Sequence, residues 1–193
     1  NQAMKSLYEN EIIDQDEFSD VDEIISVEFV DCTIKNNNLF EKKLTDCIFT
    51  NCTFSGVNMA MAKLYDTQLN NVVFDNCKIM GVDFSHCRKF LFEVRFIKCI
   101  LDFCSFENMK MPETEFIDCS MKGVDLGGAN LEKAKFLNAD LEDAIFQRTN
   151  LKKADLSTAN NFSISPTQNF IKKAIFSEIN LSGLLNEFDI KVV

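Results

Sequence analysis

Apolar residues recur in this chain at a fixed interval of five. From Phe29 to Leu156 a Phe, Leu, Ile or Met stands at every fifth position, apart from one slip of two residues near position 88. A repeat of this length constrains the architecture more than any local feature does. The first run is Phe29, Ile34, Leu39, Leu44, Phe49, Phe54, Met59, Leu64, Leu69, Phe74, Ile79 and Phe84, and the second is Leu91, Phe96, Leu101, Phe106, Met111, Phe116, Met121, Leu126, Leu131, Phe136, Leu141, Phe146, Leu151 and Leu156.

The period excludes a long helix and a long strand, because a helix repeats every 3.6 residues and a strand every two. Two residues before each apolar centre stands a slim side chain, as at Val27, Cys52 and Ala129. Positions two apart share one face of an extended segment. Each unit is therefore expected to be a three-residue strand followed by a two-residue corner, with four units returning the chain to its starting side.

The corners are rich in Asp, Asn and Gly, which adopt turn geometry at low cost. These residues are Asp31, Asn36, Asp46, Asn51, Gly56, Asp66, Asn71, Asn76, Gly81, Asn108, Asp118, Gly123, Gly128 and Asn138.

Four stretches carry a family resemblance: CTFSG at 52–56, ANLEK at 129–133, ADLED at 139–143 and ADLST at 154–158. They resemble the A(D/N)LXX repeats of pentapeptide-repeat proteins. The resemblance implies an all-β fold, a right-handed quadrilateral parallel β-helix with four repeats in each coil.

Twenty residues then separate side chains that stack on one another. Carried across the slip, this register predicts one interior column of Phe54, Phe74, Phe96, Phe116 and Phe136, and another of Cys77, Cys99 and Cys119. The extra residues around Arg88–Phe90 are expected to bulge at one corner. Two β-helices meeting at a kink at Arg88 are the alternative, but the columns on both sides of the slip fit one continuous coil.

The repeat divides the chain into three parts: an acidic N-terminal cap over 1–25, the β-helix over 26–160 and a C-terminal cap over 161–193. A solenoid needs such caps because only stacked neighbours bury its faces. We expect a strand or short helix in the first part. In the last part, Ser165, Pro166 and Gln168 have the pattern of a helix start, and Leu181–Phe188 predicts an amphipathic helix followed by a final strand.

All eight cysteines occupy the slim position two before a centre, where a thiol is a small filler of a narrow core. No CxxC pair occurs and the single histidine, His86, is not spaced as a partner ligand, so no metal site is expected. A disulfide between coils among Cys77, Cys99 and Cys119 stays open, although a reducing cytosol disfavours it.

The negative charge is concentrated at one end. Residues 1–34 hold ten acids against Lys5, and the rest of the chain holds 20 acids and 19 bases. No basic stripe is visible along the sequence, so direct nucleic-acid binding is not expected. Acids at a strand edge protect it from pairing with other molecules. Five of them also form a candidate partner surface: Asp16, Glu17, Asp20, Asp22 and Glu23.

Catalysis requires converging groups in a concave pocket, and a filled β-helix offers none. We therefore expect no enzyme and no cofactor. His86 is placed on an exposed corner, and Asp102, Lys122 and Glu142 are expected to form an exposed charge ladder.

An outward row of apolar residues is more informative. Ile97, Ile117 and Leu137 each follow a buried Phe at intervals of twenty, with Phe90 and Phe92 nearby. A contiguous apolar row marks an interface. The occupant is either an external partner or a part of the protein itself, namely the C-terminal helix or a second protomer.

The C-terminal ending resembles that of pentapeptide-repeat proteins of the Qnr-type quinolone-resistance group. This resemblance implies a homodimer formed through the C-terminal ends, here Leu184, Leu185, Phe188 and Ile190, which also serve to cap the core. It further implies binding to a type II topoisomerase, DNA gyrase or topoisomerase IV, by DNA mimicry with protection from quinolones. A rigid protein-interaction scaffold is the alternative, and the near-neutral coil region favours it, since a mimic replaces phosphates along its whole length.

The sequence also bears on the compartment. No apolar run is long enough to span a membrane, and the first residues lack the charged and apolar regions of a secretory signal. The expected location is the cytoplasm, with residues 1–3 interpreted as an expression scar before Met4.

Overall fold

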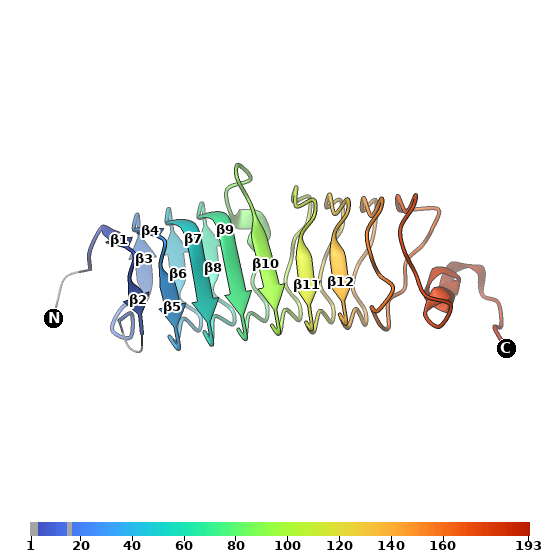
Figure 1. The fold of residues 1–193 in the computed structure, drawn as a ribbon, viewed down its shortest axis with the longest axis horizontal. Helices are drawn as coiled ribbons and strands as arrows, with labels where there is room; N and C mark the ends of the chain where they lie inside the picture. Colours follow the sequence, from blue (N-terminus) through green and yellow to red (C-terminus); the bar gives the residue numbers. More distant parts are fainter. Residues whose placement is uncertain (1–3, 15–16) are drawn as a thin grey trace.

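The chain forms a rod of stacked coils with its two ends at opposite tips (Figure 1). The structure is a computed structural model that describes residues 4–14 and 17–193. Every strand pair is parallel. The predicted all-β quadrilateral β-helix is therefore confirmed. Among the described residues, none forms a helix with the length and apolar character needed to cross a membrane.

Short strands make up the faces of the rod. They are β1 (Leu7–Glu9), β2 (Ile12–Ile13), β3 (Glu23–Ile25), β4 (Glu28–Val30), β5 (Thr33–Lys35), β6 (Lys43–Thr45), β7 (Ile48–Ser55), β8 (Lys63–Tyr65), β9 (Gln68–Asp75), β10 (Val94–Ile97), β11 (Glu115–Ile117) and β12 (Lys135–Leu137). One sheet runs in the order β1-β4-β7-β9-β10-β11-β12, with β2 and β5 joined beside this path, and a second runs β3-β6-β8. The described residues also contain three 3-10 turns: η1 (Phe84–His86), η2 (Leu181–Leu184) and η3 (Asn186–Phe188).

The register is twenty residues per coil, as the sequence predicts. Phe54 pairs with Phe74 and Phe96 with Phe116. Across the slip, Phe74 pairs with Phe96, a step of 22 that absorbs the two extra residues. The β-helix is continuous through position 88, and no kinked second helix forms there.

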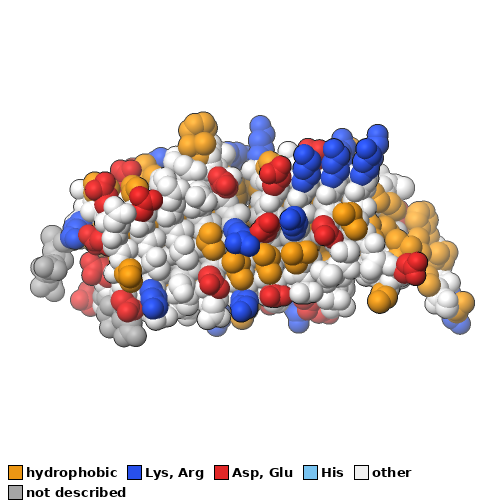
Figure 2. All heavy atoms as spheres, viewed as in Figure 1, with side chains coloured by type: hydrophobic (Ala, Val, Ile, Leu, Met, Phe, Trp, Pro, Cys, Tyr) orange, Lys and Arg blue, Asp and Glu red, His pale blue; other side chains and the backbone are white. Residues whose placement is uncertain are grey.

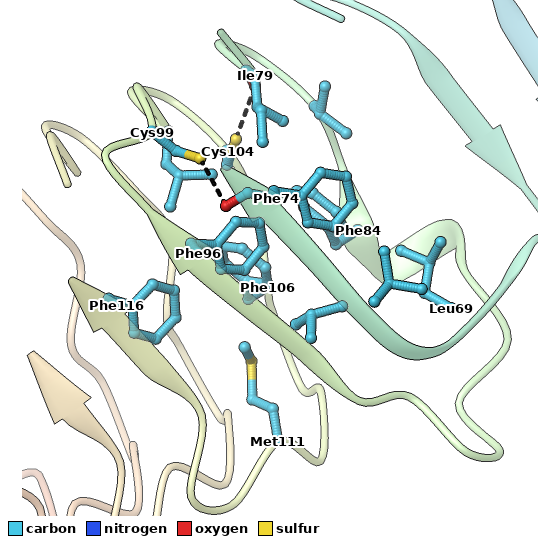
Figure 3. Close-up of a cluster of buried hydrophobic side chains, with 14 of the residues drawn as sticks. Leu69, Phe74, Ile79, Phe84, Phe96, Cys99, Cys104, Phe106, Met111 and Phe116 are labelled. Atoms are coloured by element: carbon cyan, nitrogen blue, oxygen red, sulfur yellow. Dashed lines mark hydrogen bonds between the residues drawn. The ribbon is translucent and has the colours of Figure 1, made fainter. Parts of the chain in front are cut away.

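The core is built around the predicted phenylalanine column. Successive ring centroids from Phe54 to Phe136 lie 4.9, 5.1, 5.5 and 5.1 Å apart, with nearly parallel planes. All five rings are fully buried. Phe84 and Phe106 form a second stack at 4.7 Å, and Phe96 meets Phe106 edge to face, as Figure 3 shows. Offset and edge-on contacts of this kind add to the free energy gained from burial alone.

The corners turn through the left-handed backbone region. All fourteen corner residues named from the sequence have positive φ angles, between 49° and 71°. Asn, Asp and Gly adopt this conformation with the least strain. A side chain at Gly56 would also displace the amide of Asn36 in the preceding coil, because a Cβ there would lie 2.5 Å from Asn36 Oδ1.

The slip forms a loop that projects beyond the coils between η1 and β10 (Figure 1). The amide of Arg88 still bonds to the carbonyl of Thr67 at 2.9 Å, and the ladder resumes where Glu93 bonds to Leu69 at 2.9 Å. Two residues differ from prediction here. Leu91, expected inside, is 48% exposed, whereas Phe92, expected outside, is only 7% exposed. Because the ladder resumes at Glu93, the inward position of the strand falls on residue 92.

The acidic N-terminal segment belongs to the first coil. Tyr8 of β1 stacks on Phe29 with centroids 5.0 Å apart. The Lys42 ammonium donates hydrogen bonds to the carbonyls of Phe18 and Val21 and so holds the loop that follows β2. Of the two predicted forms, a strand or a short helix, this segment contains strands.

The C-terminal segment differs from the predicted helix and strand. Around Ser165 the chain makes a turn, in which the Gln168 amide bonds to Ser165 Oγ at 3.2 Å, and no helix follows. The expected helix is replaced by η2 and η3, and residues 189–193 form no strand. Contacts with the last coil account for this. The Asn180 amide donates to the carbonyls of Leu156 and Ala159, and Gly183 accepts from Ile164, so tertiary bonds hold the tight turns in place.

The inside and outside positions predict unequal costs of truncation. Phe96→Ala removes a ring stacked on both sides and should lower the free energy of unfolding by ~3–5 kcal/mol. Lys122→Ala removes only exposed ion pairs of 3.7 and 3.8 Å to Asp140 and Glu142, worth at most about 1 kcal/mol. Chemical denaturation of both variants measures the difference, and equal losses would contradict the assignment of faces.

Candidate interaction surface

The cysteines are part of the core. All eight are buried and free. In seven of them the sulfur lies 3.0–3.6 Å from a carbonyl oxygen of the preceding coil. Figure 3 shows two such bonds, from Cys99 to Phe74 and from Cys104 to Ile79. Thr67 and Thr149 place their hydroxyls in the same way at 2.9 and 2.8 Å. The slim position thus accommodates a small hydrogen-bond donor as well as the Val and Ala that occupy it elsewhere.

Burial raises the pKa of several of these thiols above the ordinary value. It raises the pKa of Cys52 to about 11, and it raises the pKa values of Cys87 and Cys104 as well. Hydrogen bonding to Cys99, followed by burial, raises the pKa of Cys77 and of Cys119. Hydrogen bonds from Cys119 and Cys77 in turn lower the pKa of Cys99. Since the thiolate is the nucleophile and the metal ligand, the thiols whose pKa is raised are poorly suited to either role. Across 4–14 and 17–193, no cluster of His, Cys, Asp and Glu is arranged to hold a metal ion.

His86 lies on the surface at the end of η1. Its side chain is half-exposed, and Nε2 is 3.5 Å from Oδ2 of Asp83. Its ring centroid lies 5.5 Å from that of Tyr65. The position on an exposed corner matches the expectation from the sequence.

The apolar row lies where the register places it. Ile97, Ile117 and Leu137 pair directly with one another along β10, β11 and β12, and each is partly exposed. Figure 2 shows hydrophobic side chains gathered over these strands in the middle of one face. The C-terminal turns lie beyond the last coil at the tip of the rod, so they do not cover the row (Figure 1).

A line of charges and a hollow border the row. Arg95 Nε lies 2.6 Å from Glu115 Oε2, and Lys135 Nζ lies 3.8 Å from Glu115 Oε1. Beside them a hollow of about 490 Å³ opens between the slip loop and the corner of the next coil, with Leu91 and Pro112 in its lining. The face therefore combines apolar surface with balanced charge.

The acidic candidates are separate from the row. Glu17, Asp20, Asp22 and Glu23 are exposed near the N-terminal tip, and Asp16 lies outside the described residues. Glu17 accepts a hydrogen bond from the Tyr8 hydroxyl at 3.3 Å, and Glu23 accepts one from Thr45 at 2.8 Å. The intervening β4, β7 and β9 separate this end from β10 (Figure 1), so the two candidate surfaces do not form one site.

One feature of the surface was missed from the sequence. Five exposed lysines line one corner of three successive coils, and Figure 2 shows them as a blue row above and beyond β12. We call them the lysine edge: Lys133, Lys152, Lys153, Lys172 and Lys173. Backbone bonds hold the corners in register, from Lys133 to Lys152 at 2.9 Å and from Lys153 to Lys172 at 3.0 Å. The expectation that no basic stripe exists is therefore wrong, because residues twenty apart in sequence meet on one edge.

The C-terminal candidates divide into two groups. Leu184 is buried against the last coil and Leu185 is half-buried, so these two close the core. Phe188 and Ile190 are 50% and 57% exposed. Ile179 in the same C-terminal segment is also exposed, so this end of the rod carries several exposed apolar side chains.

Known proteins share this architecture. The pentapeptide repeat region family matches residues 89–162, and the pentapeptide repeats family matches residues 47–85, which together span more than half of the chain. Comparison with curated proteins gives no match.

Several solved structures have the same fold. A trypsin-treated variant of QnrB1, described as a plasmid-mediated fluoroquinolone resistance protein, superposes with a TM-score of 0.65 at 14% identity, covering 97% of each chain. A second trypsin-treated variant gives 0.64 at 15% identity, covering 98% of this chain and 100% of that one. HetL, involved in heterocyst differentiation regulation in the cyanobacterium Nostoc sp., gives 0.53 at 14% identity over 89% and 83%. With its repeat, its coil and these family matches, the chain belongs to the pentapeptide-repeat proteins.

Proposed function

We propose that this protein is a non-enzymatic rod that binds a protein partner through the face carrying Ile97, Ile117 and Leu137. The observation that carries the proposal is the direct pairing of these residues on three neighbouring strands. Their side chains stand on a backbone ladder and above a packed aromatic column, so little conformational entropy is lost on binding. A preformed apolar row of this kind suits a protein surface better than a small ligand.

The chemistry of the face supports a partner of mixed character. Fully burying an aliphatic side chain contributes roughly 1.5–3 kcal/mol, so three adjacent ones supply an anchor. The neighbouring Arg95, Glu115 and Lys135 offer charges of both signs at its margin. Such a polar rim around an apolar centre is the usual composition of a protein interface. We place the protein in the cytoplasm, where the eight thiols stay reduced.

Ile117→Asp tests the row at its centre. The buried charge should abolish capture of partners by the immobilised protein from an extract of its own source, while the melting temperature stays close to that of the parent. Ile145→Asp is the matched control, because Ile145 is also exposed but stands on another column. Partner capture that survives Ile117→Asp, or that both variants lose equally, would contradict this surface.

A type II topoisomerase is a second, more specific candidate partner. Support comes from the shape shared with QnrB1 along nearly the whole rod. The distribution of charge limits how such binding would occur. Acids on the coils are in part neutralised by bases, as Glu115 is by Arg95 and Lys135, and the stacked Asp46 and Asp66 are both paired with Arg88. DNA mimicry would therefore rest on the acidic first coil rather than on the full length.

Gyrase assays test this candidate. In supercoiling reactions with and without ciprofloxacin, the protein in molar excess should inhibit the enzyme or protect it from the drug. The triple variant Asp20→Asn, Asp22→Asn, Glu23→Gln should weaken the effect if the acidic end replaces phosphates. If the protein neither inhibits gyrase nor protects it from the drug, the topoisomerase is rejected as a partner. The role as a protein-interaction scaffold would then remain.

We also propose a homodimer through the C-terminal tip, where Phe188 and Ile190 remain exposed once Leu184 has closed the core. Phe188→Asp with Ile190→Asp should convert the dimer to a monomer without loss of fold, because neither side chain is buried in the coil. Light scattering coupled to size exclusion measures the mass. Ile12→Asp, at an exposed apolar residue of β2, is the control. A parent protein that is already monomeric would contradict the proposal.

A further inference from the structure

The lysine edge is an unneutralised feature of this rod. Within the described part of the chain, none of its five ammonium groups forms an ion pair. Lys152 contacts a ring instead, since its Nζ lies 5.8 Å from the centroid of Phe170. Like charges stacked on adjacent coils repel one another. Some other columns relieve such stacking: Lys122 lies 3.7 and 3.8 Å from Asp140 and Glu142, and Glu115 stands between Arg95 and Lys135.

We propose that the lysine edge binds a short acidic segment of a partner protein. This inference rests on the proposed protein-binding function for the class of partner, and it adds a second contact on the same side of the rod. Lys133 precedes by two residues Lys135 of β12, the strand that carries Leu137 at the end of the apolar row. Lys153 and Lys173 continue the edge along the next two coils, where Asp155 and Ile175 stack on Lys135. One partner therefore reaches both surfaces.

The surroundings of the edge favour carboxylates combined with apolar side chains. Phe170 flanks it on one side and Ile175 on the other, and both are about half exposed. Two acids of the chain also lie nearby, Glu132 and Asp155. Asp155 is partly engaged, since its Oδ1 accepts hydrogen bonds from the amide and hydroxyl of Ser157 at 2.9 and 2.6 Å. An acidic segment with an apolar residue would thus meet both kinds of surface.

The extent of the edge disfavours a nucleic acid. Three coils at a spacing of ~4.8 Å cover about 10 Å, and on the N-terminal side the same corner continues as Pro112 and Glu113. A protein binds a nucleic acid tightly when its basic residues neutralise many successive phosphates. Here a nucleic acid longer than the lysine edge would pass over acidic residues of a chain with net charge −10. An extended peptide spans the same 10 Å with three or four residues, at about 3.3 Å each.

A labelled synthetic peptide that alternates Glu with Leu is the probe, followed by fluorescence anisotropy on the full chain. It should bind the parent protein, and binding should weaken with added salt because exposed charges are screened. The double variant Lys153→Glu, Lys173→Glu should lower the affinity by about ten-fold or more. The control, Lys43→Glu with Lys63→Glu, changes two exposed lysines stacked on β6 and β8 and should change it less than about two-fold.

Other probes separate the competing occupants. The inference would be overturned if a single-stranded oligonucleotide, or vesicles containing phosphatidylserine, bound this edge more tightly than the peptide. It would also be overturned if the peptide failed to bind, or if both double variants lost affinity for it equally. The proposed protein-binding function is tested separately, by comparing partner capture by the Ile117→Asp variant with capture by the unmodified protein. If capture depends on Ile117 and not on Lys153 and Lys173, the lysine edge is rejected while the protein-binding role stands. If capture depends on both, both are supported.

Discussion

The structure depends on vertical alignment of the coils, one above another, at twenty residues per coil. Backbone bonds between parallel strands set this alignment, and the stacked rings of Phe54 to Phe136 are possible only within it. A shift of one residue in a strand would turn its inward side chains toward solvent. It would also move Asn, Asp and Gly away from the left-handed corners that they tolerate. Ladder, core and corners therefore stabilise one another, and the slip survives because its two extra residues leave the coil as a loop.

The same alignment determines what the protein offers to other molecules. The interior is packed with rings, aliphatic side chains and thiols, so recognition falls to the outside. Every outward column is a set of residues twenty apart, and its character depends on which residues the repeats place there. Ile97, Ile117 and Leu137 give an apolar row, whereas Lys133, Lys153 and Lys173 give a basic edge. Two different surfaces thus arise from one scaffold.

The period predicted most of the fold, including the pairing of Phe74 with Phe96 across the slip. The prediction from the period was wrong at positions where the local structure departs from the five-residue repeat. The sequence does not show which residue of a slip leaves the coil, and so Leu91 was expected inside in place of Phe92. The predicted C-terminal helix was wrong because bonds from Asn180 and Gly183 to the last coil favour tighter turns. The apolar row was found by stepping along the register. The lysine edge was missed because charge was considered along the chain and not by column.

A double-mutant cycle on Phe74 and Phe96 tests the account most directly, since these rings meet only if the register crosses the slip by 22 residues. Their centroids lie 5.1 Å apart. Replacing each by Leu, singly and together, should give a coupling free energy of about 0.5–1.5 kcal/mol. Phe74 and Phe116, two coils apart, should show a coupling near zero. Additive losses for Phe74 and Phe96, or a larger coupling for the distant pair, would contradict the continuous four-sided coil.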